Sequence, residues 1–224
     1  MNLRRRRCII GLLLLLPLLA LPAFSPSTYA GSLRAAQPQG IPASLLAALR
    51  QGGYVLYVRH GEANVGEDRP GLRPEDCSAQ RNLSAVGRGQ ARRFGSAQRE
   101  LGIPVATPVL ASPLCRTRET AALAFGPARV RAEPALLRLY RLSGGGTAAP
   151  AERQAALRVL DSLLERVPPA GTNRVIVAHN FPPGVGLDPL PDLGTVVVRP
   201  RGTGRGYDVV ARIPLEAWDH RHGR

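Results

Sequence analysis

Lysine is absent from this sequence: all 30 of its basic residues are arginine, against 16 acidic residues. An all-arginine choice can follow from a biased genome composition, so the net charge of +14 is weak support for a nucleic-acid partner. Aromatic residues are also scarce, at 4%, and the arginines are dispersed rather than clustered with aromatics as on nucleic-acid-binding surfaces. We therefore expect no nucleic-acid partner. A basic surface would still attract phosphorylated molecules and anionic membranes.

The first residues of the chain have the pattern of a secretory signal peptide. Four arginines at 4–7 precede an apolar run over 9–24, and in residues 28–30 Thr28 and Ala30 provide small side chains for a cleavage site. The whole chain has 224 residues and 44% hydrophobic content, which suits one mid-sized domain. We predict a signal peptide over 1–30, a linker over 31–40 and a folded domain over 41–224. The protein is then periplasmic or secreted.

The apolar run is a poor match to a transmembrane helix. Such a helix needs about 20 apolar residues, and this run is shorter and interrupted by Pro17 and Pro22. An uncleaved leader that anchors the protein to the inner membrane stays open as the alternative. We expect contact with a membrane only through such a leader.

Cysteine is rare, with three residues in the whole chain. Cys8 belongs to the leader, which leaves Cys77 and Cys115 in the domain. Export brings a protein into an oxidising compartment, where a disulfide is permitted. Two alternatives follow: a bridge between these cysteines, or two unpaired buried thiols.

Short apolar strands alternate with helices through the rest of the chain. The run YVLYV at 54–58 has the near-continuous apolar pattern of a strand buried on both faces. The alternation predicts an α/β fold: a three-layer α/β/α domain with a mainly parallel central sheet and helices on both faces. The predicted strands are 54–58, 107–111, 129–132 and 174–178, the helices are 41–50, 85–101, 114–125 and 150–167, a late hairpin pairs 195–198 with 207–213, and 63–82 is a surface loop.

Polar residues follow three of the predicted strands. Arg59 and His60 follow the first strand, Ser112 follows the second and leads to Arg116, and His179 follows the strand over 174–178. The carboxyl ends of parallel strands gather at one edge of a sheet, where ligands bind. We therefore expect the two arginines and two histidines to converge.

Such a cluster suits phosphoryl chemistry. Two guanidinium groups offer forked donors that match phosphate oxygens. Imidazoles beside fixed cations tend to be neutral, and a neutral imidazole is a nucleophile. One histidine can attack phosphorus while the other, with the arginines, stabilises charge on the equatorial oxygens. The arginines supply the positive charge, so we expect neither a metal ion nor a cofactor.

Three segments resemble those of the histidine phosphatase, or phosphoglycerate-mutase-like, superfamily. They are VRHGE at 58–62, SPLCRTRETA at 112–121 and VAH at 177–179, and residues 80–91 resemble the leucine-serine-glycine helix start of that family. The resemblance covers about residues 53–212. It implies that His60 is phosphorylated in turnover, that Arg59, Arg116 and His179 form the phosphate pocket, and that water hydrolyses the phosphohistidine.

The chain departs from the family at the proton donor. The mutase-like branch has a glutamate where residues 136–140 read LLRLY, and Glu133 is the nearest acid. The acid-phosphatase branch has an aspartate directly after the second histidine, where this chain has Asn180. The candidate proton donors are therefore Glu62 and Glu133.

These observations predict an exported, metal-independent phosphomonoester hydrolase that acts through a phosphohistidine on His60. Its substrate is expected to be a phosphorylated small molecule, and the family and the compartment together suggest an envelope sugar phosphate. The alternative is a catalytically weak or inactive module of the same fold that binds phosphate or other anions. The missing acid favours this alternative, and the intact His60 with both arginines disfavours it.

Overall fold

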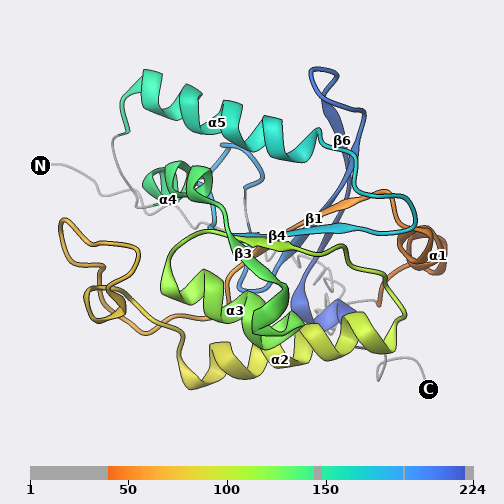
Figure 1. Ribbon diagram of the computed structural model, residues 1–224, viewed down its shortest axis with the longest axis horizontal. Helices are drawn as coiled ribbons and strands as arrows, with labels where there is room; N and C mark the ends of the chain where they lie inside the picture. The colour runs from red at the N-terminus through yellow and green to blue at the C-terminus, as the bar shows by residue number, and fades with distance from the viewer. Residues whose placement is uncertain (1–39, 144–147, 189, 220–224) are drawn as a thin grey trace, which may run out of the picture. The chain divides into compact units, whose positions relative to one another are not determined.

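The computed structural model describes residues 40–143, 148–188 and 190–219 (Figure 1). Within these residues, six strands form one sheet in the order β3-β2-β4-β1-β5-β6. The first four in that order run parallel, whereas β5 is antiparallel to both β1 and β6. The predicted mainly parallel sheet is confirmed. The strands are β1 (Val55–Arg59), β2 (Val109–Ala111), β3 (Val130–Ala132), β4 (Arg174–Ala178), β5 (Thr195–Pro200) and β6 (Tyr207–Ile213).

Helices cover both faces of the sheet, as predicted (Figure 1). One apolar core lies between the sheet and α1, α2, α3 and η4, and a second lies between the sheet and α4 and α5. The helices are α1 (Ala43–Gln51), α2 (Ala85–Glu100), α3 (Cys115–Phe125), α4 (Leu137–Ser143) and α5 (Pro150–Leu164). The short 3-10 helices are η1 (Cys77–Ala79), η2 (Pro127–Arg129), η3 (Pro134–Leu136) and η4 (Leu215–Trp218).

The central strand β1 is fixed in register by both cores. Leu56 and Val58 point into the first core, and Val55 and Tyr57 point into the second; all four side chains are fully buried. Burial of one aliphatic side chain stabilises the fold by about 1.5–3 kcal/mol. A slip of one residue would turn each side chain to the opposite face. The two cores therefore fix the direction in which the residues after β1 point.

Two helices differ from the sequence prediction. The helix expected over 150–167 ends at Leu164, and Val167, expected on its apolar face, is 58% exposed. Pro168 explains the early end, because the residue before a proline is disfavoured in the α conformation. Helix α4 was not predicted, because seven residues carry too little periodicity to mark a helix.

The predicted signal peptide over 1–30 lies outside the described residues, and so does the predicted linker except for Gly40. Among the described residues, no helix has the length and apolar character needed to cross a membrane.

Candidate active site

Three strand ends bring polar residues together at the carboxyl edge of the sheet. β1 ends at Arg59, and the backbone N–H of His60 donates to the carbonyl of Ala178 at the end of β4, 3.0 Å away. His179 follows β4 directly, and Ser112 follows β2, the other neighbour of β4. The parallel sheet therefore brings these residues to one edge, as expected from their positions after strands.

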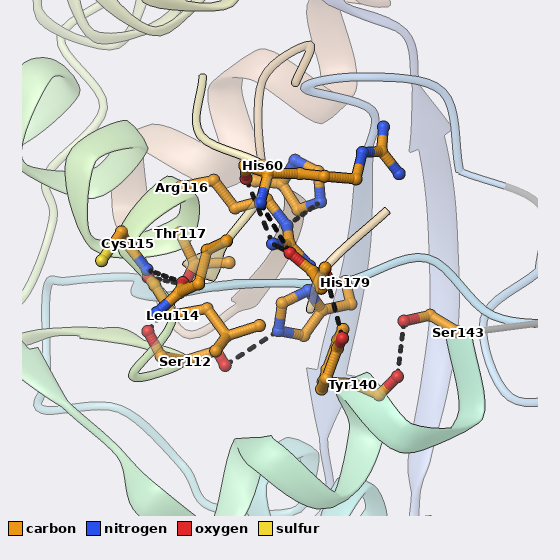
Figure 2. Close-up of polar contacts among 12 residues, drawn as sticks. His60, Ser112, Leu114, Cys115, Arg116, Thr117, Tyr140, Ser143 and His179 are labelled. Carbon is orange, nitrogen blue, oxygen red and sulfur yellow. Dashed lines mark hydrogen bonds and ion pairs between the residues drawn. The ribbon is translucent and has the colours of Figure 1, made fainter. Parts of the chain in front are cut away.

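Arg116 reaches this edge from the first turn of α3. Its Nε–H donates to Nε2 of His60 across 3.2 Å (Figure 2). Both side chains are buried, with exposed fractions of 4% for Arg116 and 8% for His60. The imidazole rings of His60 and His179 lie 5.6 Å apart between centroids. One guanidinium and two imidazoles thus form a single buried cluster.

Arg59 lies at the same site, but the loop between β4 and β5 holds its guanidinium group. Nη1 donates to the carbonyl of Leu190 at 2.8 Å, and Nη2 forms an ion pair with Asp192 at 3.0 Å. Within the described residues, the Nε–H of Arg59 has no hydrogen-bond partner.

A cavity of about 770 Å³ lies over these residues. The predicted nucleophile His60 lines it, and so do the three residues predicted to form the phosphate pocket, Arg59, Arg116 and His179. Four further charged residues and one tyrosine that line it were not predicted: Glu67, Asp68, Arg81, Asp192 and Tyr140. In the described part of the chain, no group of three or more His, Cys, Asp or Glu side chains is arranged to hold a metal ion. The full lining is Arg59, His60, Glu62, Ala63, Gly66, Glu67, Asp68, Arg81, Arg116, Tyr140, Ser143, His179, Asn180 and Asp192.

The hydrogen bonds of His60 define its tautomer. Nδ1 lies 2.7 Å from the carbonyl oxygen of Gly61, which can only accept, so Nδ1 carries the proton. Nε2 then has the lone pair, and it accepts from the Nε–H of Arg116. Burial, and then the positive charge of Arg116, lower the pKa of His60 to about 3. The ring is therefore neutral at ordinary pH, with its nucleophilic nitrogen facing a fixed cation.

His179 is the more deeply buried of the two histidines, with 1% of its surface exposed. Its Nε2 lies 2.8 Å from Oγ of Ser112 (Figure 2). Its backbone carbonyl accepts from the Tyr57 hydroxyl. Within the described residues, its Nδ1 has no hydrogen-bond partner. Burial, and then the neighbouring His60 and Arg116, place the pKa of His179 well below its usual value. A bound phosphate dianion would oppose that shift and would favour a protonated His179 that donates to it.

A model of the histidine phosphatase superfamily (branch 1) matches residues 55–137. This stretch contains β1 and also His60 and Arg116, whose side chains are hydrogen-bonded to each other in the cavity. Over this stretch the chain is similar to the histidine phosphatase superfamily. A comparison with curated proteins finds no match.

Solved structures of phosphatases are similar to the chain at low sequence identity. The protein histidine phosphatase SixA in complex with tungstate is 16% identical, with a TM-score of 0.47, over 72% of this chain and 97% of that one. The phosphoserine phosphatase of Entamoeba histolytica in complex with 3-phosphoglyceric acid is 16% identical, with a TM-score of 0.45, over 71% of this chain and 96% of that one.

The two candidate proton donors occupy different places in the structure. Glu62 lines the cavity, and its Oε1 accepts from Oγ of Ser84 at 2.6 Å. Glu133 is not among the lining residues; its carboxylate caps η3 by accepting from the backbone N–H of Ala135. Asn180 lines the cavity, but its side-chain oxygen is used by the backbone N–H of Leu190. Of the two candidates, the structure brings only Glu62 to the cavity.

The segment expected to be a surface loop, residues 63–82, supplies part of the cavity wall. Asp68 turns inward, where its two carboxylate oxygens accept from Nη1 and Nη2 of Arg116, each at 3.1 Å. The same carboxylate accepts from the hydroxyl of Tyr140 on α4 at 2.8 Å. Nothing in the local sequence marks either residue. The loop that carries Asp68 has no periodicity, and the helix that carries Tyr140 has only seven residues.

A disulfide ties this loop to the helix that carries Arg116. Cys77 and Cys115 are bonded, with Cα atoms 5.7 Å apart. Of the two alternatives left open by the sequence, the structure has the bridge. Gln80 adds a second tie, because its Oε1 accepts from the backbone N–H of Cys115 at 2.8 Å. The residue before Arg116 is therefore fastened to the loop through both its sulfur and its backbone.

Proposed function

We propose that this protein is a histidine phosphatase that hydrolyses phosphomonoesters through a phosphohistidine formed on Nε2 of His60, without a metal ion. The orientation of the His60 ring carries the proposal: Gly61 holds Nδ1, and Nε2 faces the Nε–H of Arg116. A neutral imidazole whose lone pair lies beside a fixed cation suits a group that accepts a phosphoryl moiety.

The reaction proceeds in two displacements at phosphorus. The lone pair of His60 Nε2 attacks, a bond from nitrogen to phosphorus forms, and the bond from phosphorus to the ester oxygen breaks. The Nε–H of Arg116, freed from Nε2, then bonds a phosphoryl oxygen instead. In the second step, water attacks phosphorus and the phosphorus–nitrogen bond breaks, which returns the lone pair to Nε2. Inorganic phosphate leaves with the protons of the water. His179 and Arg59 add positive charge, which stabilises the equatorial oxygens in both transition states.

The leaving oxygen needs a proton when the substrate is an alkyl ester. Glu62 is the acid we assign to this step, because its carboxyl group lines the cavity that holds His60. A positioned general acid contributes about 100- to 10,000-fold to such a step. Ser84 bonds Glu62 from the start of α2 and orients the carboxyl group.

Export is part of the proposal, with a periplasmic or secreted location. It rests on the arginine-led apolar segment over 1–30 and on the Cys77–Cys115 disulfide, a bond that persists in oxidising compartments. A phosphorylated sugar of the cell envelope is a substrate that such an enzyme would meet. The cavity wall is mostly charged and polar, which suits a leaving group rich in hydroxyls.

One observation favours a second function, a phosphate-binding module with little turnover. The position that holds an aspartate donor in the acid-phosphatase branch is Asn180, and its amide fixes the backbone of Leu190 instead. Such a module would keep the arginines and histidines and bind phosphate without cleaving esters.

Hydrolysis of para-nitrophenyl phosphate by the full chain, in the presence of a chelator, distinguishes the two functions. This leaving group needs little help from an acid, so the step assigned to Glu62 does not limit the assay. We expect turnover by the wild type and none by His60→Ala. A radiolabelled phosphoprotein, stable in base and labile in acid, should be trapped from the wild type alone.

Two outcomes would contradict the proposal. Equal turnover by His60→Ala would exclude His60 as the nucleophile, and turnover lost to the chelator would exclude the metal-independent route. A folded wild type that binds vanadate but releases no nitrophenol would favour the binding module.

A further inference from the structure

Arg116 uses four distinct acceptor atoms in this structure, and three of them lie on the loop over 63–82. A guanidinium group has five N–H donors in a fixed plane. Nη1 donates to Oδ1 of Asp68 at 3.1 Å and to the carbonyl of Arg81 at 3.2 Å, and Nη2 donates to Oδ2 of Asp68 at 3.1 Å. Nε donates to His60. The loop thus holds the outer nitrogens, and the inner N–H faces the nucleophile.

Asp68 is itself held from two further directions. Its Oδ1 accepts from the backbone N–H of Arg81 at 2.7 Å, and its Oδ2 accepts from the Tyr140 hydroxyl at 2.8 Å. Only 10% of its side chain is exposed. Burial alone would raise the pKa of Asp68, but the Arg81 N–H, the Arg116 charge and the Tyr140 hydroxyl together lower it. A charged carboxylate with four donors is a rigid support.

The backbone that carries Asp68 is also fixed. Gln80 donates from Nε2 to the carbonyls of Arg73, Pro74 and Asp76, which closes the far end of the loop. The disulfide and the Gln80 bond to Cys115 then join this loop to the start of α3. Loop, carboxylate and guanidinium are therefore joined in one continuous set of bonds.

We propose that Asp68 is a positioning residue for the phosphoryl transfer. It holds the guanidinium of Arg116 by its two outer nitrogens, so that the Nε–H stays aimed at the group bound to Nε2 of His60. The proposal rests on the function proposed above. Tyr140 supports Asp68, and neither residue touches the reacting atoms. A guanidinium displaced by about 1 Å would lose transition-state stabilisation worth about 100-fold in rate.

The opposing interpretation is that Asp68 is an internal competitor, a carboxylate that occupies the arginine fork until phosphate displaces it. The contacts favour positioning, because Asp68 bonds the outer nitrogens whereas a phosphoryl group on His60 would meet the Nε–H. The two interpretations predict opposite changes in anion affinity.

Kinetics of the full chain on para-nitrophenyl phosphate test the proposal. We expect kcat to fall about 10- to 100-fold in Asp68→Asn and further in Asp68→Ala, with a smaller change in KM. Inhibition by vanadate, whose geometry resembles the transition state, should weaken more than inhibition by phosphate. Tyr140→Phe should lower kcat and weaken vanadate inhibition as well, by a smaller factor than Asp68→Asn. Asp76→Asn, an exposed carboxylate on the same loop, should behave as the wild type.

A double-mutant cycle shows whether Asp68 acts through Arg116. In an Arg116→Ala background, Asp68→Asn should cause no further loss, because the group that it positions is gone. Equal losses in both backgrounds would overturn the proposal. Tighter vanadate binding by Asp68→Asn would also overturn it, because that result is expected if Asp68 competes with phosphate for Arg116. So would an unchanged kcat, because Asp68 would then have no role in the reaction.

Calorimetric titration with vanadate separates this proposal from the function on which it depends. If the wild type binds vanadate but does not turn over, the proposed function fails. Weaker vanadate binding by Asp68→Asn would then still support the positioning role, and unchanged binding would overturn it.

Discussion

Nδ1 of His60 lies 2.7 Å from the carbonyl oxygen of Gly61, the next residue in the chain. This bond fixes the tautomer, and burial of the ring, together with the Arg116 guanidinium on its other side, opposes a second proton. His179 is buried beside the same charges, and its pKa is also lowered. Both histidines therefore stay neutral in the fold under conditions that protonate them in an unfolded chain.

The free energy of unfolding should fall as the pH is lowered from about 6.5 toward 3. An unfolded histidine binds a proton near pH 6.5, whereas folded His60 does so only at about 3. Between these values the unfolded chain binds more protons, so stability is fully present above the window and is lost as the pH falls, by up to about 1.4 kcal/mol per pH unit for each histidine. Urea unfolding at a series of pH values measures the slope. His60→Gln should reduce it, and equal slopes in both proteins would contradict the buried neutral state.

Glu62→Gln should slow the hydrolysis of alkyl phosphates much more than that of para-nitrophenyl phosphate. An alkoxide needs a proton as it leaves, and nitrophenolate does not, so the loss should be about 100-fold or more for glycerol phosphate and small for the aryl ester. Glu133→Gln is the matched control, because that carboxylate caps η3 and does not line the cavity. If Glu62→Gln slowed both substrates equally, Glu62 would have another role, such as support of the Ser84 contact.

The sequence predicts the sheet edge of this site well, and the reason is physical. Apolar runs mark the buried strands, and a parallel sheet places their carboxyl ends together. His60 and His179 follow β1 and β4, which pair directly, so their strand positions alone place them as neighbours. Arg116 follows from its short distance to Ser112 after β2.

The remainder of the site depends on contacts that no local pattern specifies. Asp68 lies in a loop without periodicity, and only its bonds to Arg116 and Tyr140 turn it inward. Tyr140 belongs to a helix of seven residues, too short to reveal which face is buried. The sequence does not predict the disulfide either. Composition and compartment permit a bridge, but one forms only if the fold brings Cys77 and Cys115 together.

Removal of the disulfide should lower both stability and activity. The bridge joins residues 38 positions apart. Closing a loop of that size lowers the entropy of the unfolded chain, which stabilises the fold by about 3–4 kcal/mol. Cys77→Ala/Cys115→Ala should therefore unfold at lower denaturant concentration than the wild type. Its kcat should fall as well, since the loop that holds Asp68 loses its covalent tie to α3. A reductant should lower the stability and the kcat of the wild type and change neither in the double variant. A normal kcat in the double variant would show that Gln80 alone holds the loop.

Two glycines in the first turns of α2 should respond in opposite directions to alanine. A Cβ at Gly87 would overlap the backbone carbonyl oxygen of Glu62, because the helix start packs directly against the segment after His60. Gly87→Ala should therefore cost about 1–3 kcal/mol of stability and displace Glu62, which reduces turnover of alkyl phosphates. Gly89 is exposed in the same helix with nothing within 4 Å of a Cβ, so Gly89→Ala should stabilise the fold by about 0.5–1 kcal/mol and leave activity unchanged. Thermal unfolding and hydrolysis of glycerol phosphate measure both effects. Equal changes in stability in the two variants would contradict the prediction, because only Gly87 lies against the backbone of Glu62.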